Sequence, residues 1–192
     1  MNRLIMLSLL TTVFINFVRG QSTFVYLTTN EEIIKAGVRL GEKEKQPGFV
    51  HYTGEYYMGG IVFRVWKTGE TEHGLIAAMS DVAKNKNWNV SDSLCNAYSV
   101  DSFTNWRLPT KEELDFLCQF NKKMQPVLFR VGSGNTRFLQ GNYWSSTRYE
   151  MDTIGDSVWC EIIYAIHETY DCYKAGATKT EPNQSARPII EY

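Results

Sequence analysis

The 192-residue chain lacks the motifs by which common enzyme classes are recognised. Its three histidines, His51, His73 and His167, form neither an H-E-x-x-H pattern nor another metal-binding spacing. It contains no G-x-S-x-G motif and no phosphate-binding loop. None of its four cysteines forms a C-x-x-C pair, which argues against a zinc finger or a thioredoxin-type motif. We therefore predict a protein that is not an enzyme and that holds no metal and no cofactor.

Long hydrophobic runs are missing beyond the N-terminus. Residues 4–18 are mostly apolar, follow Asn2 and Arg3, and lead into the small residues that precede a cleavage point. This pattern is typical of a secretory signal peptide at residues 1–20, cleaved near Gly20. Because the run is short and interrupted by polar residues, it does not fit a membrane anchor. We expect an exported protein, either periplasmic, on the cell surface or secreted, with no transmembrane segment.

A strong charge of one sign is also missing. The net charge is −1, and losing Arg3 and Arg19 with the signal peptide takes it to −3. An exported, slightly acidic chain does not carry the basic surface that nucleic acid binding requires. We therefore expect no nucleic acid partner.

The composition that is present indicates a compact fold rich in strands. Hydrophobic residues make up 43% of the chain and aromatic residues 14%, including five tryptophans and eleven tyrosines. Residues 21–51 combine charged residues with a turn at Pro47 and Gly48, and we interpret them as an N-terminal arm or linker. Residues 52–192 form the one predicted domain.

Hydrophobic periodicity and turn residues place the secondary structure of this domain. Strands are predicted at 59–66, 74–78, 143–146, 158–164, 169–173 and 186–190. One helix is predicted within 91–98. A second runs from Lys111 to about Phe120, because Pro109 precedes a capping box formed by Thr110 and Glu113. Residues 121–142, which contain Pro126 and several glycines, are predicted as a loop.

The four cysteines all follow the signal peptide. An even number of cysteines in an oxidising compartment favours disulfides. The strands at 158–164 and 169–173 flank a turn near Ile166, which would set Cys160 opposite Cys172. Cys95 with Cys118 would then join the two helices. Free buried thiols are the alternative, since cysteine also packs well as a small apolar residue.

Three short phrases are the most distinctive part of the sequence: W-R-L-P-T at 106–110 with Glu113 and Leu114, Y-W-S-S-T at 143–147, and A-R-P-I at 186–189. Together with G-G-I-V-F at 59–63 and H-G-L-I-A at 73–77, they resemble the Lcl C-terminal domain family of bacterial secreted proteins over residues 52–192. The resemblance implies an α+β, C-type-lectin-like fold with small antiparallel sheets, two helices and long loops. The family takes its name from a collagen-like bacterial adhesin that binds sulfated glycosaminoglycans.

The resemblance also implies a disulfide between the first helix and the final strand. That strand has no cysteine here, which leaves Cys118 as the local substitute partner for Cys95. Glu181, Pro182 and Asn183 match the calcium-binding tripeptide of true C-type lectins, but no acidic residue follows them until Glu191. We therefore predict no calcium site there.

The residues of the three phrases have two interpretations. Trp106 and Trp144 could stack on sugars, and Arg107 and Arg187 could bind an anion, but residues embedded in such fold-defining segments more often pack or tie loops together. We assign a structural role to the following residues: Trp106, Arg107, Pro109, Glu113, Trp144 and Arg187.

Charge is segregated along the domain. Residues 116–149 contain no acid, whereas residues 150–171 contain six acids and no lysine or arginine. We hypothesise a ligand-binding patch for an anionic or sulfated glycan, formed by Lys122, Lys123, Arg130 and Arg137. The alternatives are that the acidic hairpin neutralises these residues or that they are simply solvated.

The sequence thus predicts an exported, non-catalytic binding or adhesion module. The alternative is a structural or assembly subunit of a bacterial envelope complex that docks to a protein partner through the N-terminal arm.

Overall fold

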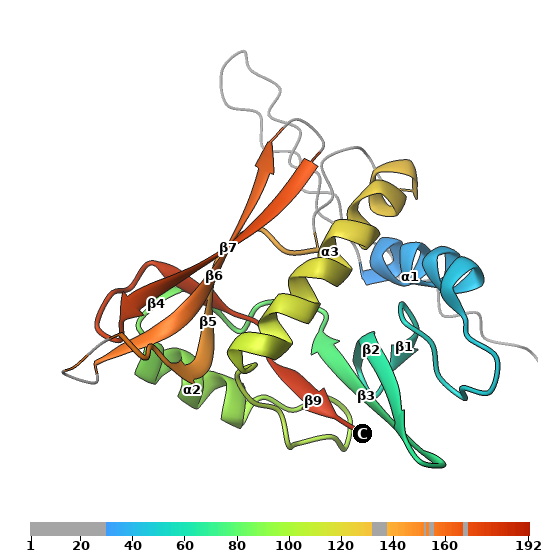
Figure 1. Ribbon diagram of the computed structural model, residues 1–192, viewed down its shortest axis with the longest axis horizontal. Coiled ribbons are helices and arrows are strands. Elements are labelled where there is room, and N and C mark those ends of the chain that lie inside the picture. The colour runs from blue at the N-terminus through green and yellow to red at the C-terminus, as the bar shows by residue number, and fades with distance from the viewer. Residues whose placement is uncertain (1–29, 132–137, 152, 154–155, 167–168) are drawn as a thin grey trace, which may run out of the picture.

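The computed structural model describes residues 30–131, 138–151, 153, 156–166 and 169–192, with the backbone alone described at 129–131, 162–166 and 169–170. The predicted signal peptide, residues 1–20, lies outside the described residues. The described chain is α+β, as predicted (Figure 1). Its helices are α1 (Asn30–Glu44), α2 (Trp88–Ala97) and α3 (Lys111–Val131). Its strands are β1 (Tyr56–Tyr57), β2 (Gly60–Thr68), β3 (Thr71–Ala78), β4 (Ala83–Lys86), β5 (Gly141–Arg148), β6 (Ser157–Ile166), β7 (Thr169–Thr178), β8 (Gln184–Ala186) and β9 (Ile189–Glu191).

The strands form two sheets. One has the order β1-β2-β3-β9 and the other the order β4-β8-β5-β6-β7. Neighbouring strands are antiparallel except β5 and β8, which pair in parallel through Tyr143 and Ser185. Helix α3 runs diagonally across the centre of the molecule in Figure 1, contacts strands of both sheets and packs against α1. No helix in the described ranges is long and apolar enough to cross a membrane.

The predicted strand at 186–190 is instead two short strands in different sheets, because the chain crosses between the sheets at Arg187 and Pro188. A second crossing, from Ala78 to Val82, runs alongside: the Ala78 N–H donates to Pro188 O at 2.9 Å, and the Val82 N–H to Ala186 O at 3.0 Å. The side chain of Arg187, only 4% exposed, donates to Asp81 Oδ1 at 2.7 Å. It also donates to the carbonyls of Ala78 and Phe138.

Helix α3 begins at the predicted capping box. The Glu113 N–H donates to Thr110 Oγ1 at 3.2 Å, and the Thr110 N–H donates to Glu113 Oε2 at 2.7 Å. Arg107 adds two hydrogen bonds to the Glu113 carboxylate, at 2.7 and 2.6 Å. Such a bidentate contact holds both side chains in one geometry.

The three phrases of the sequence meet around this helix start. Arg107 and Ile189 exchange two backbone hydrogen bonds, and Pro109 O accepts one from the Ser146 N–H at 2.8 Å. Trp106 and Trp144 lie 2% and 0% exposed among the neighbouring side chains. Segments 106–110, 143–147 and 186–189 therefore form one contiguous junction between the sheets.

The prediction that residues 121–142 form a loop is wrong over its first half, since α3 continues to Val131 through Pro126. An apolar face continues along the helix with Leu117, Met124 and Leu128, each completely buried. Burying this face outweighs the backbone hydrogen bond that Pro126 cannot make, a loss of about 3 kcal/mol in a helix interior. Lys122 and Lys123 are therefore helical residues.

The segment interpreted as an arm or linker contains helix α1, which packs into the main core through Ile33, Ala36 and Leu40. The sequence analysis did not predict this helix. Gly37 and Gly41 allow the close approach: a methyl group at Gly37 would overlap the carbonyl of Gly54, and one at Gly41 would overlap the ring of Tyr52. The helix is therefore an integral layer of the described structure.

The predicted disulfide pairings are wrong. Cys118 of α3 is bonded to Cys172 of β7, with their Cα atoms 6.4 Å apart, while Cys95 and Cys160 are free and buried. The hairpin register pairs Cys172 with Ile163 and Cys160 with Ala175. Because Cys160 is three positions from the partner of Cys172, the two cysteines lie on opposite faces of the sheet. Burial raises the pKa of Cys95 to about 12 and that of Cys160 to about 11, so both stay unreactive thiols.

We predict that Gly37→Ala lowers the free energy of unfolding by about 2–3 kcal/mol, because the added methyl group overlaps backbone that cannot move away cheaply. Urea unfolding measures this difference. Val38→Ala, on the exposed side of the same helix, is the matched control and stays within about 0.5 kcal/mol of the parent. Equal midpoints for both variants would contradict the docking of α1.

A second prediction concerns Glu113. Burial works to raise its pKa, but the hydrogen bonds from Arg107 and the Thr110 N–H outweigh burial and hold the pKa below 4.5. Glu113→Gln should therefore lose about 2 kcal/mol of stability at pH 7. This loss is present above the unfolded-state pKa and shrinks as the pH falls through the lower folded-state value. Thermal unfolding between pH 3 and 7 tests it, with the exposed Glu112→Gln as control; a gap that stays constant with pH would refute the prediction.

Candidate functional site

A cavity of about 360 Å³ opens between the end of α1, the segment 46–53, strand β2 and helix α3. Its wall is part aromatic and part charged. The aromatic side is made by Tyr52, Phe63, Phe116 and Phe120, and the charged groups are Arg64, Lys123 and Glu44. This size and mixture are typical of a site for a small molecule or for one unit of a larger ligand.

A β-bulge in β2 directs Arg64 into this cavity. The register against β3 shifts between Val62 and Arg64, so Phe63 is an extra residue on its strand. Side chains on a regular strand alternate between faces, and a bulge resets that alternation. Phe63 and Arg64 consequently both lie on the side of the sheet that faces α3.

The Arg64 guanidinium lies over aromatic rings. Its central carbon is 3.4 Å from the ring centroid of Phe116 and 5.3 Å from that of Trp66. Within the described part of the chain, no carboxylate lies within salt-bridge distance of Arg64. Packing of a guanidinium on aromatic rings does not use its N–H groups as hydrogen-bond donors, so they can still bind an anion.

The segment that closes the cavity is held by two carboxylates. The backbone N–H groups of Val50 and His51 donate to the Glu72 carboxylate at 2.7 and 3.0 Å. Glu55 accepts from the Tyr52 N–H at 3.2 Å and contacts His51 Nδ1 at 3.0 Å. These contacts preform the wall, which lowers the ordering cost of binding.

Tyr52 supplies a neutral hydroxyl at the same wall. Burial, with additional effects of the Glu55 and Glu42 carboxylates, raises its pKa above 10. The phenol is therefore protonated at neutral pH and acts as a hydrogen-bond donor rather than as a base. The arrangement suits binding of a ligand with an apolar face and an anionic group.

The predicted basic patch is distributed differently from the hypothesis. Lys122 Nζ lies 3.3 Å from Asp171 of β7, whereas Lys123 Nζ lies 3.0 Å from Glu44 of α1. Consecutive helical residues point about 100° apart, so these two lysines face different neighbours. The side chain of Arg130 and the whole of Arg137 lie outside the described residues. Of the four, Lys123 is found at the cavity.

The ion pair of Lys122 with Asp171 corresponds to the alternative in which the acidic hairpin neutralises nearby cations.

The calcium-like tripeptide of Glu181, Pro182 and Asn183 follows β7. Glu181 accepts a hydrogen bond from the Thr178 hydroxyl at 2.9 Å. Asn183, the last residue of this tripeptide, is exposed.

Arg64 was missed by the sequence analysis, although one signal was present. A single charge interrupts the apolar run G-I-V-F-R-V-W at residues 60–66. Simple alternation would place Arg64 on the same face as Val62, and only the bulge moves it to the other face. The direction of this side chain could therefore not be read from the pattern.

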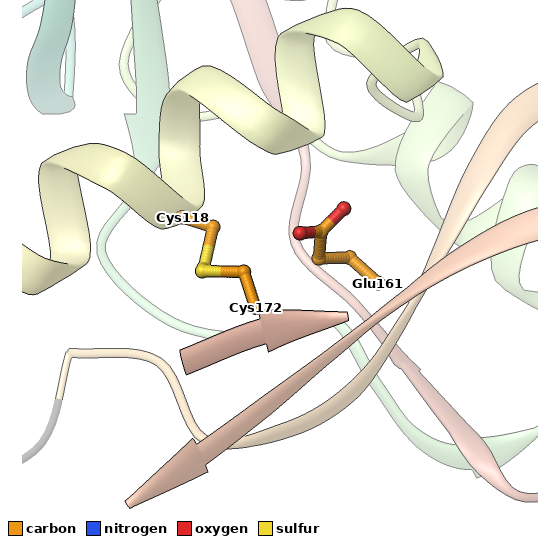
Figure 2. Close-up of side chains that lie close together, drawn as sticks. All are labelled: Cys118, Glu161 and Cys172. Carbon is orange, nitrogen blue, oxygen red and sulfur yellow. A yellow bond between two sulfur atoms is a disulfide. The ribbon is translucent and has the colours of Figure 1, made fainter. Parts of the chain in front are cut away.

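A second unanticipated feature is the buried carboxyl group of Glu161 in β6. Its side chain is 2% exposed, and Oε1 has no hydrogen-bond partner in the described structure. It lies beside the disulfide below α3 (Figure 2), with a carboxyl oxygen and the sulfurs of Cys118 and Cys172 all within 4.8 Å of one another. Burial raises the pKa of Glu161 to about 7, Asp115 adds to the rise, and Lys174 and Lys122 oppose it.

Comparison of the chain with protein-family models, with curated proteins and with solved structures finds no match.

The raised pKa of Glu161 leads to a stability prediction for the oxidised, metal-free protein. The carboxyl group ionises more readily in the unfolded chain, so the parent loses stability as the pH rises from about 5 to about 8. Glu161→Gln lacks this loss and should melt several degrees higher than the parent at pH 8, with the two converging toward pH 5.

Calorimetric melting in the presence of a chelator measures this effect. Glu70→Gln, in the exposed turn between β2 and β3, removes an acid without burial and should show no such pH dependence. A difference in melting temperature between the parent and Glu161→Gln that stays the same from pH 5 to pH 8 would contradict the prediction.

Proposed function

We propose that this protein is an exported, non-catalytic binding or adhesion module that recognises an anionic, sulfated glycan in the cavity between α1, β2 and α3. Arg64 is the central anion contact and Lys123 a second cation at the rim. Its C-type-lectin-like fold and its kinship with the Lcl C-terminal domain family are part of the same proposal, suggested by the three phrases that meet at the junction of the sheets. The disulfide is consistent with an oxidising compartment.

The proposal rests mainly on the surroundings of the Arg64 guanidinium. The Arg64 guanidinium is partly buried, packed on Phe116 and without a carboxylate partner in the described structure. By contrast, Arg107 is paired with Glu113 and Arg187 with Asp81. Planar N–H edges bind carboxylates and sulfate-like oxyanions through two parallel hydrogen bonds. An anionic ligand would therefore supply the partner that the protein itself does not.

The aromatic side of the cavity supports a sugar as the carrier of that anion. A pyranose ring has an apolar C–H face that packs on aromatic rings, and hydroxyl groups that accept from donors such as the Tyr52 phenol. Lys123 is 56% exposed in its pair with Glu44, so the pair is easily rearranged by a ligand. A sulfated or uronic-acid sugar combines all these features.

The alternative, an envelope assembly subunit that docks through the N-terminal arm, gains less support from the structure. The apolar face of α1 is covered by α3 and is not free to bind a partner.

Calorimetric titration of the full chain with a heparin-derived oligosaccharide, in low salt and with a chelator, tests the proposal. We expect binding that a desulfated oligosaccharide does not reproduce and that Arg64→Gln weakens about 10- to 100-fold, as expected for loss of a charged hydrogen-bond pair. Absence of binding to the sulfated oligosaccharide would reject the proposal.

Lys67→Gln is the matched control, because it removes one positive charge from the exposed end of the same strand. Its effect should be no more than about twofold, reflecting only long-range charge. Equal losses in Arg64→Gln and Lys67→Gln would show that binding depends on net charge and not on the cavity.

A further inference from the structure

We propose that Cys118, Cys172 and Glu161 form a zinc-binding site when the disulfide between the two cysteines is reduced. The proposal is independent of the glycan cavity, which lies on another side of α3. It rests on three observations: the geometry of the donor atoms, the unsatisfied carboxyl oxygen, and the charges around the cluster.

The donor set is suited to zinc. Two thiolates and a carboxylate are ligands of tetrahedral Zn²⁺, with bonds of about 2.3 Å to sulfur and about 2.0 Å to oxygen. These bonds place neighbouring ligand atoms about 3.5–3.8 Å apart. The three donor atoms already lie within 4.8 Å of one another, so the reduced sulfurs and the carboxylate need to shift by only about 1–2 Å.

The backbone is compatible with this rearrangement. The Cα atoms of Cys118 and Cys172 are 6.4 Å apart, toward the long end of the range that a disulfide spans. The two residues come from α3 and β7, and Glu161 comes from the neighbouring strand β6 (Figure 2). Two sulfurs can therefore separate by rotation of their side chains while the helix and the hairpin stay in place.

The carboxyl group of Glu161 has no other evident role. An unsatisfied buried polar atom destabilises the folded state, and such atoms are rare in native proteins. Oε1 of Glu161 is buried, lacks a hydrogen bond in the described structure and lies next to the disulfide. A metal ion bound between the carboxylate and the sulfurs would supply the missing partner.

Positive side chains near the cluster offset the negative charge of the three anionic ligands. Two thiolates and one carboxylate leave a net charge of −1 after Zn²⁺ binds. Lys122 of α3 and Lys174 of β7 both act on Glu161 as positive charges. Asp115 of α3 acts in the opposite sense, and each lysine is shared with a carboxylate: Lys174 pairs with Asp115 at 3.2 Å, and Lys122 with Asp171 at 3.3 Å. The cluster therefore has cations on two of the elements that pack around it.

Opening the site requires reduction of the disulfide, and a dithiol is a suitable two-electron reductant. A dithiol donates two electrons, the bond between Cys118 and Cys172 breaks, and the dithiol becomes a cyclic disulfide while two protein thiols form. Zinc binding then releases the two thiol protons, together with the Glu161 proton where that group is protonated. The fourth position of the tetrahedron stays open to water or to a ligand.

The test uses the full chain with Cys95→Ala and Cys160→Ala, so that only the proposed cysteines remain. Protein reduced by a phosphine, which becomes the phosphine oxide, is titrated with Co²⁺ and then with Zn²⁺. We expect one equivalent of Co²⁺ with a thiolate charge-transfer absorption, its displacement by Zn²⁺, and no binding to the oxidised protein. Glu161→Gln should weaken binding at least about tenfold, and Cys118→Ser or Cys172→Ser should abolish the absorption.

Glu70→Gln is the control for loss of one acidic charge and should bind as the parent does. Near-ultraviolet circular dichroism follows the fold, which zinc should preserve or restore in the reduced protein. The proposal is overturned by equal affinity in Glu161→Gln, by equal binding to the oxidised protein, by thiolate absorption in the serine variants, by no binding to reduced protein, or by reduced protein that stays unfolded with stoichiometric zinc.

Discussion

The buried ion pair of Arg187 with Asp81 is the interaction on which the arrangement of the two sheets depends. It lies where the chain passes from one sheet to the other, once before β4 and once before β9. Removing two charges from water is costly unless every donor finds an acceptor. Here Arg187 also donates to two backbone carbonyls, and the Tyr143 hydroxyl donates to the other carboxylate oxygen of Asp81. A buried network of this kind, with bonds to both crossings, fixes the position of one crossing relative to the other.

The contacts at that junction fix the position of helix α3, and helix α3 in turn positions both candidate sites. Arg107 and Glu113 hold its first turn against the segment that pairs with β9. One side of the helix presents Phe116 and Lys123 to the cavity, and another side presents Cys118 and Lys122 to the β6–β7 hairpin. A displacement of α3 would therefore alter the cavity and the buried cluster together, although the two have different chemistry.

The parts of the fold that were predicted correctly have local signals. The hairpin of β2 and β3, the hairpin of β6 and β7 and the capped start of α3 depend on residues only a few positions apart. The failures involve distant partners. The apolar face of helix α1 is modest, and it is buried because α3 and the loop at Gly54 pack against it. Pro126 is tolerated within α3 because the apolar face of that helix is also buried in the core. Of the candidate sites, sequence reasoning found Lys123 but neither Arg64 nor Glu161.

The sequence by itself determined the α+β class, most strand and helix positions and the structural role of the three phrases. Periodicity, capping and turn chemistry depend on residues that are only a few positions apart in the chain. Only the tertiary structure decided the partner of Cys172, the direction of Arg64 and the burial of Glu161. Each of these depends on strand register, and a shift of one residue in register moves a side chain to the opposite face of a sheet. In these hairpins the register is set by the geometry of the turn, by the β-bulge and by packing against other elements, and the periodicity of the sequence reports none of these.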